Sequence, residues 1–188
     1  MPAGIAAAKK TKSQNIPIIE SSNIGSFSRE ALCYIVQLGF GSANDQDSNG
    51  STDACLSLGV PNVAIITGEG MSGGAIAITT ANRVLMFEHA IYSVISPEAA
   101  SSILWRDGTK AQEAATSMKI TAQDMLRFGV IDSILREPSG GAHRDPNTMI
   151  AATGDAIEQA LNDLRNLDPD TIRKQRRQKF LDIGRKLG

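Results

Sequence analysis

Residues 66–81 concentrate positions with little or no side chain between two apolar runs. Within seven positions the chain carries Gly68, Gly70, Ser72, Gly73 and Gly74. A strand that enters such a turn and leaves it as a helix exposes backbone N–H groups at the helix N-terminus, where the helix dipole adds positive potential. The residue types and their spacing therefore predict a turn that binds an anion through its backbone.

Two kinds of anion fit this turn. Residues 68–73 read as GxGxxG, and Glu88 lies twenty residues beyond Gly68, where a dinucleotide-binding fold places its ribose-binding acid. There the anion is a pyrophosphate, whereas in acyl chemistry it is an oxyanion that forms during the reaction. The adjacent Gly73 and Gly74, the short helix that follows, and the lack of His, Lys or Cys in the turn favour the oxyanion. Glycines that serve only tight packing are a third interpretation.

Strand and helix signals alternate on either side of the turn. The apolar runs 60–67, 83–88, 90–95 and 130–135 have strand character, and residues 73–81 have helical character. Further helix starts are indicated by Ser96-Pro97-Glu98, by Thr109, and by a capping-box-like Thr121, whose helix Gly129 ends. Trp105 is expected in the core of the protein. The alternation predicts an α/β fold with a largely parallel sheet.

The two ends of the chain differ in character. Residues 15–19 predict a short strand, and residues 28–39 a helix that Gly39 ends, whereas the small, polar residues 41–54 predict a loop. The helix face is formed by Ala31, Tyr34, Ile35 and Leu38. A C-terminal pair of helices is predicted, the second opened by Asp168-Pro169. Their apolar faces carry Ile157, Ala160, Leu161, Leu164 and Leu167, and then Ile172, Phe180, Ile183 and Leu187.

Seven basic residues crowd the last helix between Arg173 and Lys186, against the single acid Asp182. A solvated helix face is one interpretation, and a surface for an acidic partner or a phosphorylated ligand is the other.

Composition excludes several classes of function. The chain has 188 residues, 41% of them apolar, which suits a single globular core, and its net charge of −1 with 4% aromatic residues argues against nucleic acid. Two cysteines, Cys33 and Cys55, and two histidines do not make a set of metal ligands. No apolar stretch is long enough for a membrane helix. We expect a cytoplasmic protein; the basic N-terminus leaves a plastid location as the alternative.

A set of motifs in fixed order resembles the alpha subunit family of the bacterial-type acetyl-CoA carboxylase carboxyltransferase. The resemblance runs from Leu58 to Gly184. Its pieces are LGVP, GEGMSGGAIAI, RVLMFEHAIYSVISPE, SSILWRD, KAQEAATSMKITAQDMLRFGVID and EPSGGAHRDP, followed by LRNLDPDTIRKQRRQKFLDIG. The resemblance implies a crotonase-like spiral core. We assign residues 1–57 to a divergent N-terminal segment, residues 58–146 to that core in partial form, and residues 147–188 to the C-terminal helices.

The resemblance also implies a reaction and its participants. A carboxyl group passes from carboxybiotin, held on a separate biotin carboxyl carrier protein, to acetyl-CoA, and malonyl-CoA for fatty acid synthesis is formed. The partners implied are a zinc-bearing beta subunit in an alpha2beta2 assembly, and biotin carboxylase. No cofactor is expected to be covalently bound to this chain, and no metal.

The site residues follow from the same resemblance. Gly73 and Gly74 match the paired glycines whose N–H groups form the oxyanion hole, and Gly70, Met71 and Ser72 are expected to line the substrate site. Residues 140–144 match a further signature, expected as a structural turn or as a wall of the active site.

The chain departs from the family pattern in several places. Asn23 and Phe27 replace an aspartate and a tyrosine, Met71 replaces a glycine, and Ala99-Ala100 replaces a Gly-Cys pair. Because the family's first portion is not recognisable, a degenerate, non-catalytic paralogue or fragment with a structural or interaction role stands as the alternative to the transferase. A dinucleotide-binding domain is the minor alternative.

Overall fold

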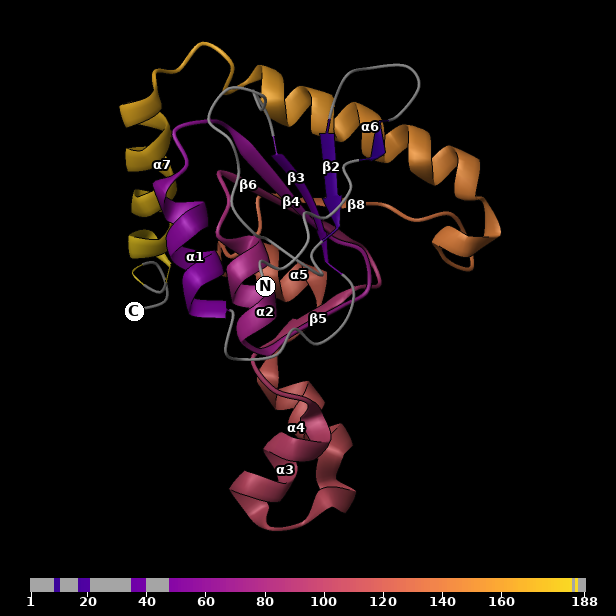
Figure 1. The fold of residues 1–188 in the computed structure, drawn as a ribbon. Coiled ribbons are helices and arrows are strands. Elements are labelled where there is room, and N and C mark those ends of the chain that lie inside the picture. The colour runs from indigo at the N-terminus through magenta and orange to yellow at the C-terminus, as the bar shows by residue number, and fades with distance from the viewer. Residues whose placement is uncertain (1–8, 11–16, 21–34, 40–47, 184, 186–188) are drawn as a thin grey trace, which may run out of the picture.

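The computed structural model describes residues 9–10, 17–20, 35–39, 48–183 and 185, and a six-stranded sheet forms its centre (Figure 1). The strand order is β1-β2-β3-β4-β6-β8, and all pairs are parallel except β1 with β2. The strands are β1 (Lys9–Lys10), β2 (Pro17–Glu20), β3 (Ile35–Gly39), β4 (Asn62–Ile66), β6 (Arg83–Phe87) and β8 (Ser133–Leu135). The predicted parallel α/β sheet is confirmed.

A second, two-stranded parallel sheet pairs β5 (Glu69–Met71) with β7 (Ile91–Ser93). Each of these short strands directly follows a strand of the large sheet, so the chain passes from one sheet to the other twice in succession. The helices are α1 (Ser48–Ser57), α2 (Ser72–Thr79), α3 (Pro97–Trp105), α4 (Ala111–Met118), α5 (Ala122–Arg127), α6 (Pro146–Asn162) and α7 (Pro169–Asp182). Two short 3₁₀ helices lie at Gly108–Lys110 and Ala142–Arg144.

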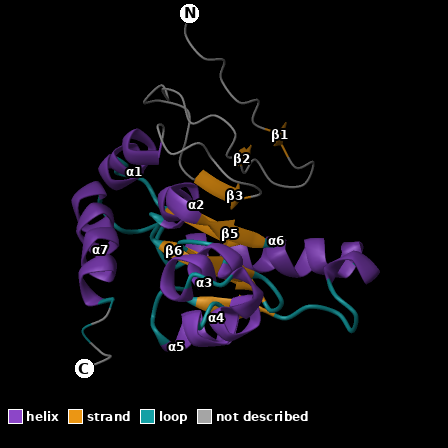
Figure 2. Cartoon of the chain, turned by 90° about the horizontal axis from the view of Figure 1, so that it is seen from below, coloured by secondary structure: helices purple, strands orange, loops and turns teal. Residues whose placement is uncertain are grey.

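The core lies around the middle strands of the large sheet. Every residue of β4 is buried, as are four of the five in β6, as expected for parallel strands with neighbours on both edges. Figure 2 shows α6 along one side of the sheet and α1 beside α7. By contrast, α3 and α4 project from the body in Figure 1, and we call residues 94–119 the arm.

Most helix starts follow the sequence signals. Ser96 accepts a hydrogen bond from the Ala99 N–H with Pro97 in the first turn of α3, Thr121 accepts from the Asp124 N–H, and Asp168 begins α7. Thr109 is not the cap of α4: its own N–H and hydroxyl donate to Asp107, which caps the preceding 3₁₀ turn.

Three further predictions about local structure are wrong. Residues 35–39 form a strand, because pairing with β2 and β4 outweighs the helical spacing of Ile35 and Leu38; Ala31 and Tyr34 lie outside the described residues. The predicted loop 41–54 is helical from Ser48, and its first seven residues lie outside the described ranges. Trp105 is not in the core: it ends α3 on the arm and is 40% exposed.

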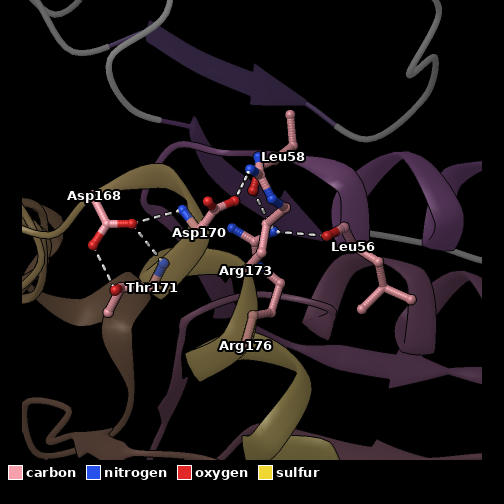
Figure 3. A network of polar contacts seen from close by, with 7 residues as sticks. All are labelled: Leu56, Leu58, Asp168, Asp170, Thr171, Arg173 and Arg176. Atoms are coloured by element: carbon pink, nitrogen blue, oxygen red, sulfur yellow. Dashed lines mark hydrogen bonds and ion pairs between the residues drawn. The ribbon is translucent and has the colours of Figure 1, made fainter.

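The C-terminal helix pair is confirmed, but its basic run is not simply a solvated face. Arg176 has no exposed surface at all. Its guanidinium donates to the carbonyl oxygens of Cys55 (2.6 Å), Leu58 (2.8 Å) and Val60 (3.0 Å), and more weakly to that of Leu56. Figure 3 shows the side chain pointing from α7 toward the end of α1. The orphan carbonyls of a helix C-terminus are thus satisfied by an arginine more than a hundred residues away.

Two buried asparagines complete this network. Arg176 donates to the side-chain oxygens of Asn62 (3.1 Å) and Asn82 (2.7 Å). Asn62 in turn accepts from the Asn82 N–H, and the Asn82 amide donates to the Ile172 carbonyl. Burial lowers the pKa of Arg176 to about 10, so the group is still charged at neutral pH, held by oxygen dipoles.

Replacing Arg176 tests how much the network contributes. We expect Arg176→Met to lower the free energy of unfolding of the full chain by roughly 3 kcal/mol, because several buried oxygens lose their donor. The matched control is Arg177→Met on the exposed side of α7, expected within about 0.5 kcal/mol of the parent. Urea unfolding followed by circular dichroism measures both, and equal midpoints for the two variants would contradict the assignment.

Candidate functional site

The turn between β5 and α2 places two glycines in the first turn of a helix. Met71 is extended (φ −132°, ψ 151°), and Ser72 then takes the left-handed conformation (φ 63°) that opens α2. No side chain at the N-cap position satisfies the first N–H groups of the helix. Gly73 and Gly74 therefore lie in a first turn whose amides have no intrahelical acceptor. We call residues 70–74 the glycine turn.

The glycines of this turn have different surroundings. Gly70 lies beside Tyr92: a Cβ built on Gly70 would be 3.1 Å from the Tyr92 ring and 3.4 Å from Ile66. Gly74 is buried and Gly73 half-buried, and neither has a positive φ. Close packing explains Gly70 without a ligand, while the φ angles of Gly73 and Gly74 do not themselves require glycine.

Met71 and Ser72 differ in backbone strain. The resemblance places a glycine at Met71, yet the extended backbone there accepts a side chain without strain, and Met71 is half-buried. The strained position is Ser72, which adopts a conformation that costs an L-residue energy. Strain of this kind occurs preferentially at functional sites. The substrate-binding role predicted for Gly70, Met71 and Ser72 stays a prediction.

The dinucleotide pattern does not fit this structure. Residues 69–71 of the GxGxxG form strand β5, paired with β7, and α2 has only eight residues. The carboxylate of Glu88 accepts a hydrogen bond from the Glu137 N–H at 3.2 Å. The acid expected to bind a ribose instead binds the protein's own backbone.

Residues 140–144 form a turn fixed by Glu137. Gly140 and Gly141 have φ of 90° and 99°, which only glycine adopts readily. The Glu137 carboxylate, 8% exposed, accepts from the Ala142 N–H on one oxygen and from His89 on the other. Burial raises the pKa of Glu137, but these hydrogen bonds outweigh it and hold the pKa below its usual value. The contacts assign a structural role to the turn; an active-site wall is not tested by them.

The glycine turn is suited to stabilising a developing negative charge rather than to proton transfer by a side chain. Its five residues carry no acid or base, so its chemistry rests on oriented N–H groups. In the part of the chain that the structure describes, no group of three or more His, Cys, Asp or Glu residues is placed to hold a metal ion. The helices among the described residues are all too short or too polar to cross a membrane.

Comparison with known proteins gives the family. The model of a family described as acetyl co-enzyme A carboxylase carboxyltransferase-like matches residues 46–184. The chain belongs to this family. It is 86% identical over 137 residues to an acetyl-coenzyme A carboxylase carboxyl transferase subunit alpha from Bradyrhizobium sp. (strain BTAi1), and 82% identical over 138 residues to that of Nitrobacter winogradskyi. Each match covers 73% of this chain but 43% of the relative, so the chain spans less than half the length of these carboxyltransferase subunits.

Solved structures confirm the crotonase-like fold. A Pseudomonas malonate decarboxylase hetero-tetramer aligns with a TM-score of 0.61 at 17% identity, over 82% of this chain and 66% of that chain. An enoyl-CoA hydratase from Mycobacterium avium subsp. paratuberculosis aligns with a TM-score of 0.59 at 13% identity, over 96% of this chain and 85% of that one. The family match begins at residue 46, twelve residues before the motifs recognised in the sequence, and so includes all of α1.

Reasoning from the sequence missed one contact of the glycine turn. The Tyr92 ring packs on Gly70, and its hydroxyl lies 2.9 Å from the Thr79 hydroxyl at the end of α2. Tyr92 occurred within the family motifs, but no pattern in the sequence links it to Gly70 or Thr79. The signal lies in the parallel register that places Tyr92 opposite Gly70.

The backbone of Ser72 can be tested without reference to activity. We expect Ser72→Gly to be more stable than Ser72→Ala by about 1 kcal/mol, because both variants lose the hydroxyl and only glycine adopts a positive φ without penalty. Ala151→Gly, on the exposed side of α6, should have the opposite sign and destabilise by about 1 kcal/mol. Urea unfolding of the three variants decides, and an Ala variant as stable as the Gly variant at residue 72 would be inconsistent with the strained turn.

Proposed function

We propose that this chain acts as the alpha part of an acetyl-CoA carboxyltransferase, which transfers a carboxyl group from carboxybiotin to acetyl-CoA and forms malonyl-CoA. The observation that carries the proposal is the glycine turn, to which the N-cap side chain makes no hydrogen bond, in a chain 86% identical to a subunit of that name. The reaction needs fixed donors for oxygens that become negative, and backbone N–H groups supply them.

The chemistry of the reaction matches the residues available. Biotin carried on a separate protein supplies the carboxyl group and, once CO₂ has left its ring nitrogen, that nitrogen takes the proton from the acetyl methyl group. The acetyl enolate then attacks CO₂, and malonyl-CoA results. No side-chain base is required, consistent with the composition of residues 70–74.

Within this mechanism, Gly73 and Gly74 bind the developing negative charge on the biotin oxygen through their N–H groups. The half-buried to buried setting of the two residues strengthens such hydrogen bonds by limiting competition from water. Loss of one donor of this type typically lowers the rate by about 10²–10³-fold. The second oxyanion, on the thioester, is assigned to donors of the partner chain.

The proposed partner is a zinc-bearing beta subunit, in an alpha2beta2 assembly that works with biotin carboxyl carrier protein and biotin carboxylase. The arm supports such an assembly, because three consecutive apolar residues at its tip face solvent: Ile103, Leu104 and Trp105. Val94 at its base is 66% exposed. A projecting element with an apolar tip is typical of a surface that a second chain covers. The Bradyrhizobium and Nitrobacter relatives favour a bacterial cytoplasm as the location.

Replacing Gly74 by valine tests the oxyanion assignment. We expect Gly74→Val to lower kcat for malonyl-CoA formation by at least about 10²-fold in the complex with the beta subunit, while the complex still forms. The control is Gly154→Val on α6, where the added side chain meets open space. A Gly74→Val enzyme with the parent's rate would refute the role of the turn.

Replacing Ile103 by lysine tests the arm as the surface for the beta subunit. We expect Ile103→Lys to weaken the complex about 10-fold or more, because a charge enters an apolar contact. Ile150→Lys on α6 is a matched control, since both isoleucines are 70% exposed. Sedimentation of the mixed chains measures the affinity. Equal affinities would exclude the arm, and absence of both complex and turnover in the parent would favour the non-catalytic interaction protein.

A further inference from the structure

Tyr92 contacts both elements that define the glycine turn. It lies on β7 directly opposite Gly70 on β5, and its ring would be 3.1 Å from a Cβ at that position. Its hydroxyl lies 2.9 Å from the hydroxyl of Thr79, the last residue of α2. One side chain thus touches the strand that enters the turn and the far end of the helix that leaves it.

The direction of the Tyr92–Thr79 hydrogen bond follows from counting hydrogens. The Thr79 hydroxyl has a single hydrogen, which points to the carbonyl oxygens of Ala75 (2.9 Å) and Ile76 (3.2 Å) in its own helix. Thr79 therefore accepts, and Tyr92 donates. Burial raises the pKa of Tyr92, which keeps this donor protonated.

Other contacts fix Tyr92 itself. Its N–H donates to the Ile120 carbonyl at 3.0 Å, and the neighbouring Ile91 N–H donates to the Gly68 carbonyl at 3.0 Å. The backbone of β7 is held on one side by the segment before α5 and on the other by the residues that lead into β5. The ring and hydroxyl of Tyr92 therefore have a fixed base from which to orient α2.

We propose that Tyr92 is a positioning residue for the glycine turn: it fixes the axis of α2 relative to β5 and so aims the N–H groups of Gly73 and Gly74. The reason is geometric. Ser72 changes the chain direction at a single strained residue at one end of α2, and the Tyr92 hydroxyl contacts Thr79 at the other end, so Tyr92 ties the direction of the helix to the strand on which its ring packs. An error of about 1 Å in the position of a catalytic donor can lower a rate about 10²-fold.

The effect on turnover rests on the proposed function and is measured in the complex with the beta subunit. Tyr92→Phe keeps the ring on Gly70 and loses the hydrogen bond, so we expect kcat to fall about 10-fold with the KM for acetyl-CoA within about twofold of the parent. Thr79→Val should have the same effect, Thr79→Ser should retain the parent's rate, and the double variant should be no slower than either single one.

Thr80→Val is the matched control. Thr80 also donates to a carbonyl one turn back, that of Ile76 at 2.8 Å, but no bond from its hydroxyl to Tyr92 is present. Thr80→Val removes a hydroxyl-to-carbonyl hydrogen bond from the same end of α2, so we expect its kcat to equal that of the parent. A fall in Thr80→Val equal to that in Tyr92→Phe, or a kcat for Tyr92→Phe within twofold of the parent, would overturn the proposal.

A second measurement needs no turnover. Amide hydrogen exchange of the full chain should be about 10-fold faster at Ala77 and Thr79, whose N–H groups lie beyond the first turn of α2, in Tyr92→Phe than in the parent, and unchanged at Ile157 in α6. Unchanged exchange at these two residues of α2 would also overturn the proposal. If the parent complex forms no malonyl-CoA, the proposed function fails, while the exchange rates still decide the role of Tyr92.

Discussion

The arrangement of the helices depends on the hydrogen bonds that the Arg176 guanidinium donates. It lies at a point where four segments meet: the end of α1, the residues that lead into β4, the turn before β6, and α7. Each of these segments ends or begins with backbone or amide oxygens that the fold removes from water, and an unpaired buried oxygen is costly. An arginine side chain can satisfy these oxygens together, because its guanidinium carries five N–H donors.

The Arg176 network is connected to the glycine turn through the strands β4 and β6. Asn62 begins β4, whose far end leads through residues 67–68 into β5 and the turn, and the Asn62 amide also donates to the Thr80 carbonyl just after α2. Lys179, one turn beyond Arg176, pairs with Asp132, whose carboxylate also accepts from the Val84 N–H on β6. The C-terminal end of α2 and the strands beside it are therefore anchored to α7, while the N-cap side chain makes no hydrogen bond to the N-terminus of α2.

The parts of the molecule that could be predicted are those determined by interactions between residues close in sequence. The β-branched run before the turn becomes β4, and local caps at Ser96, Thr121 and Asp168 start helices as expected. The failures depend on distant partners. Residues 48–57 have no apolar period, and that helix is held by Arg176; a strand replaced the predicted helix at residues 35–39 because β4 offers it an edge. The position of the candidate site could be predicted from glycines and family motifs, whereas the strain at Ser72 and the contact with Tyr92 could not.

The Arg176 network also sets an order of events during synthesis. The Leu58 carbonyl precedes its donor by 118 residues, so the end of α1 leaves the ribosome long before the guanidinium that completes it. At usual translation speeds that interval is on the order of ten seconds, far longer than a helix or hairpin needs to form. During this interval the carbonyl oxygens at the end of α1 lack their native donor. The contacts of Arg176 therefore form only after α7 has been made.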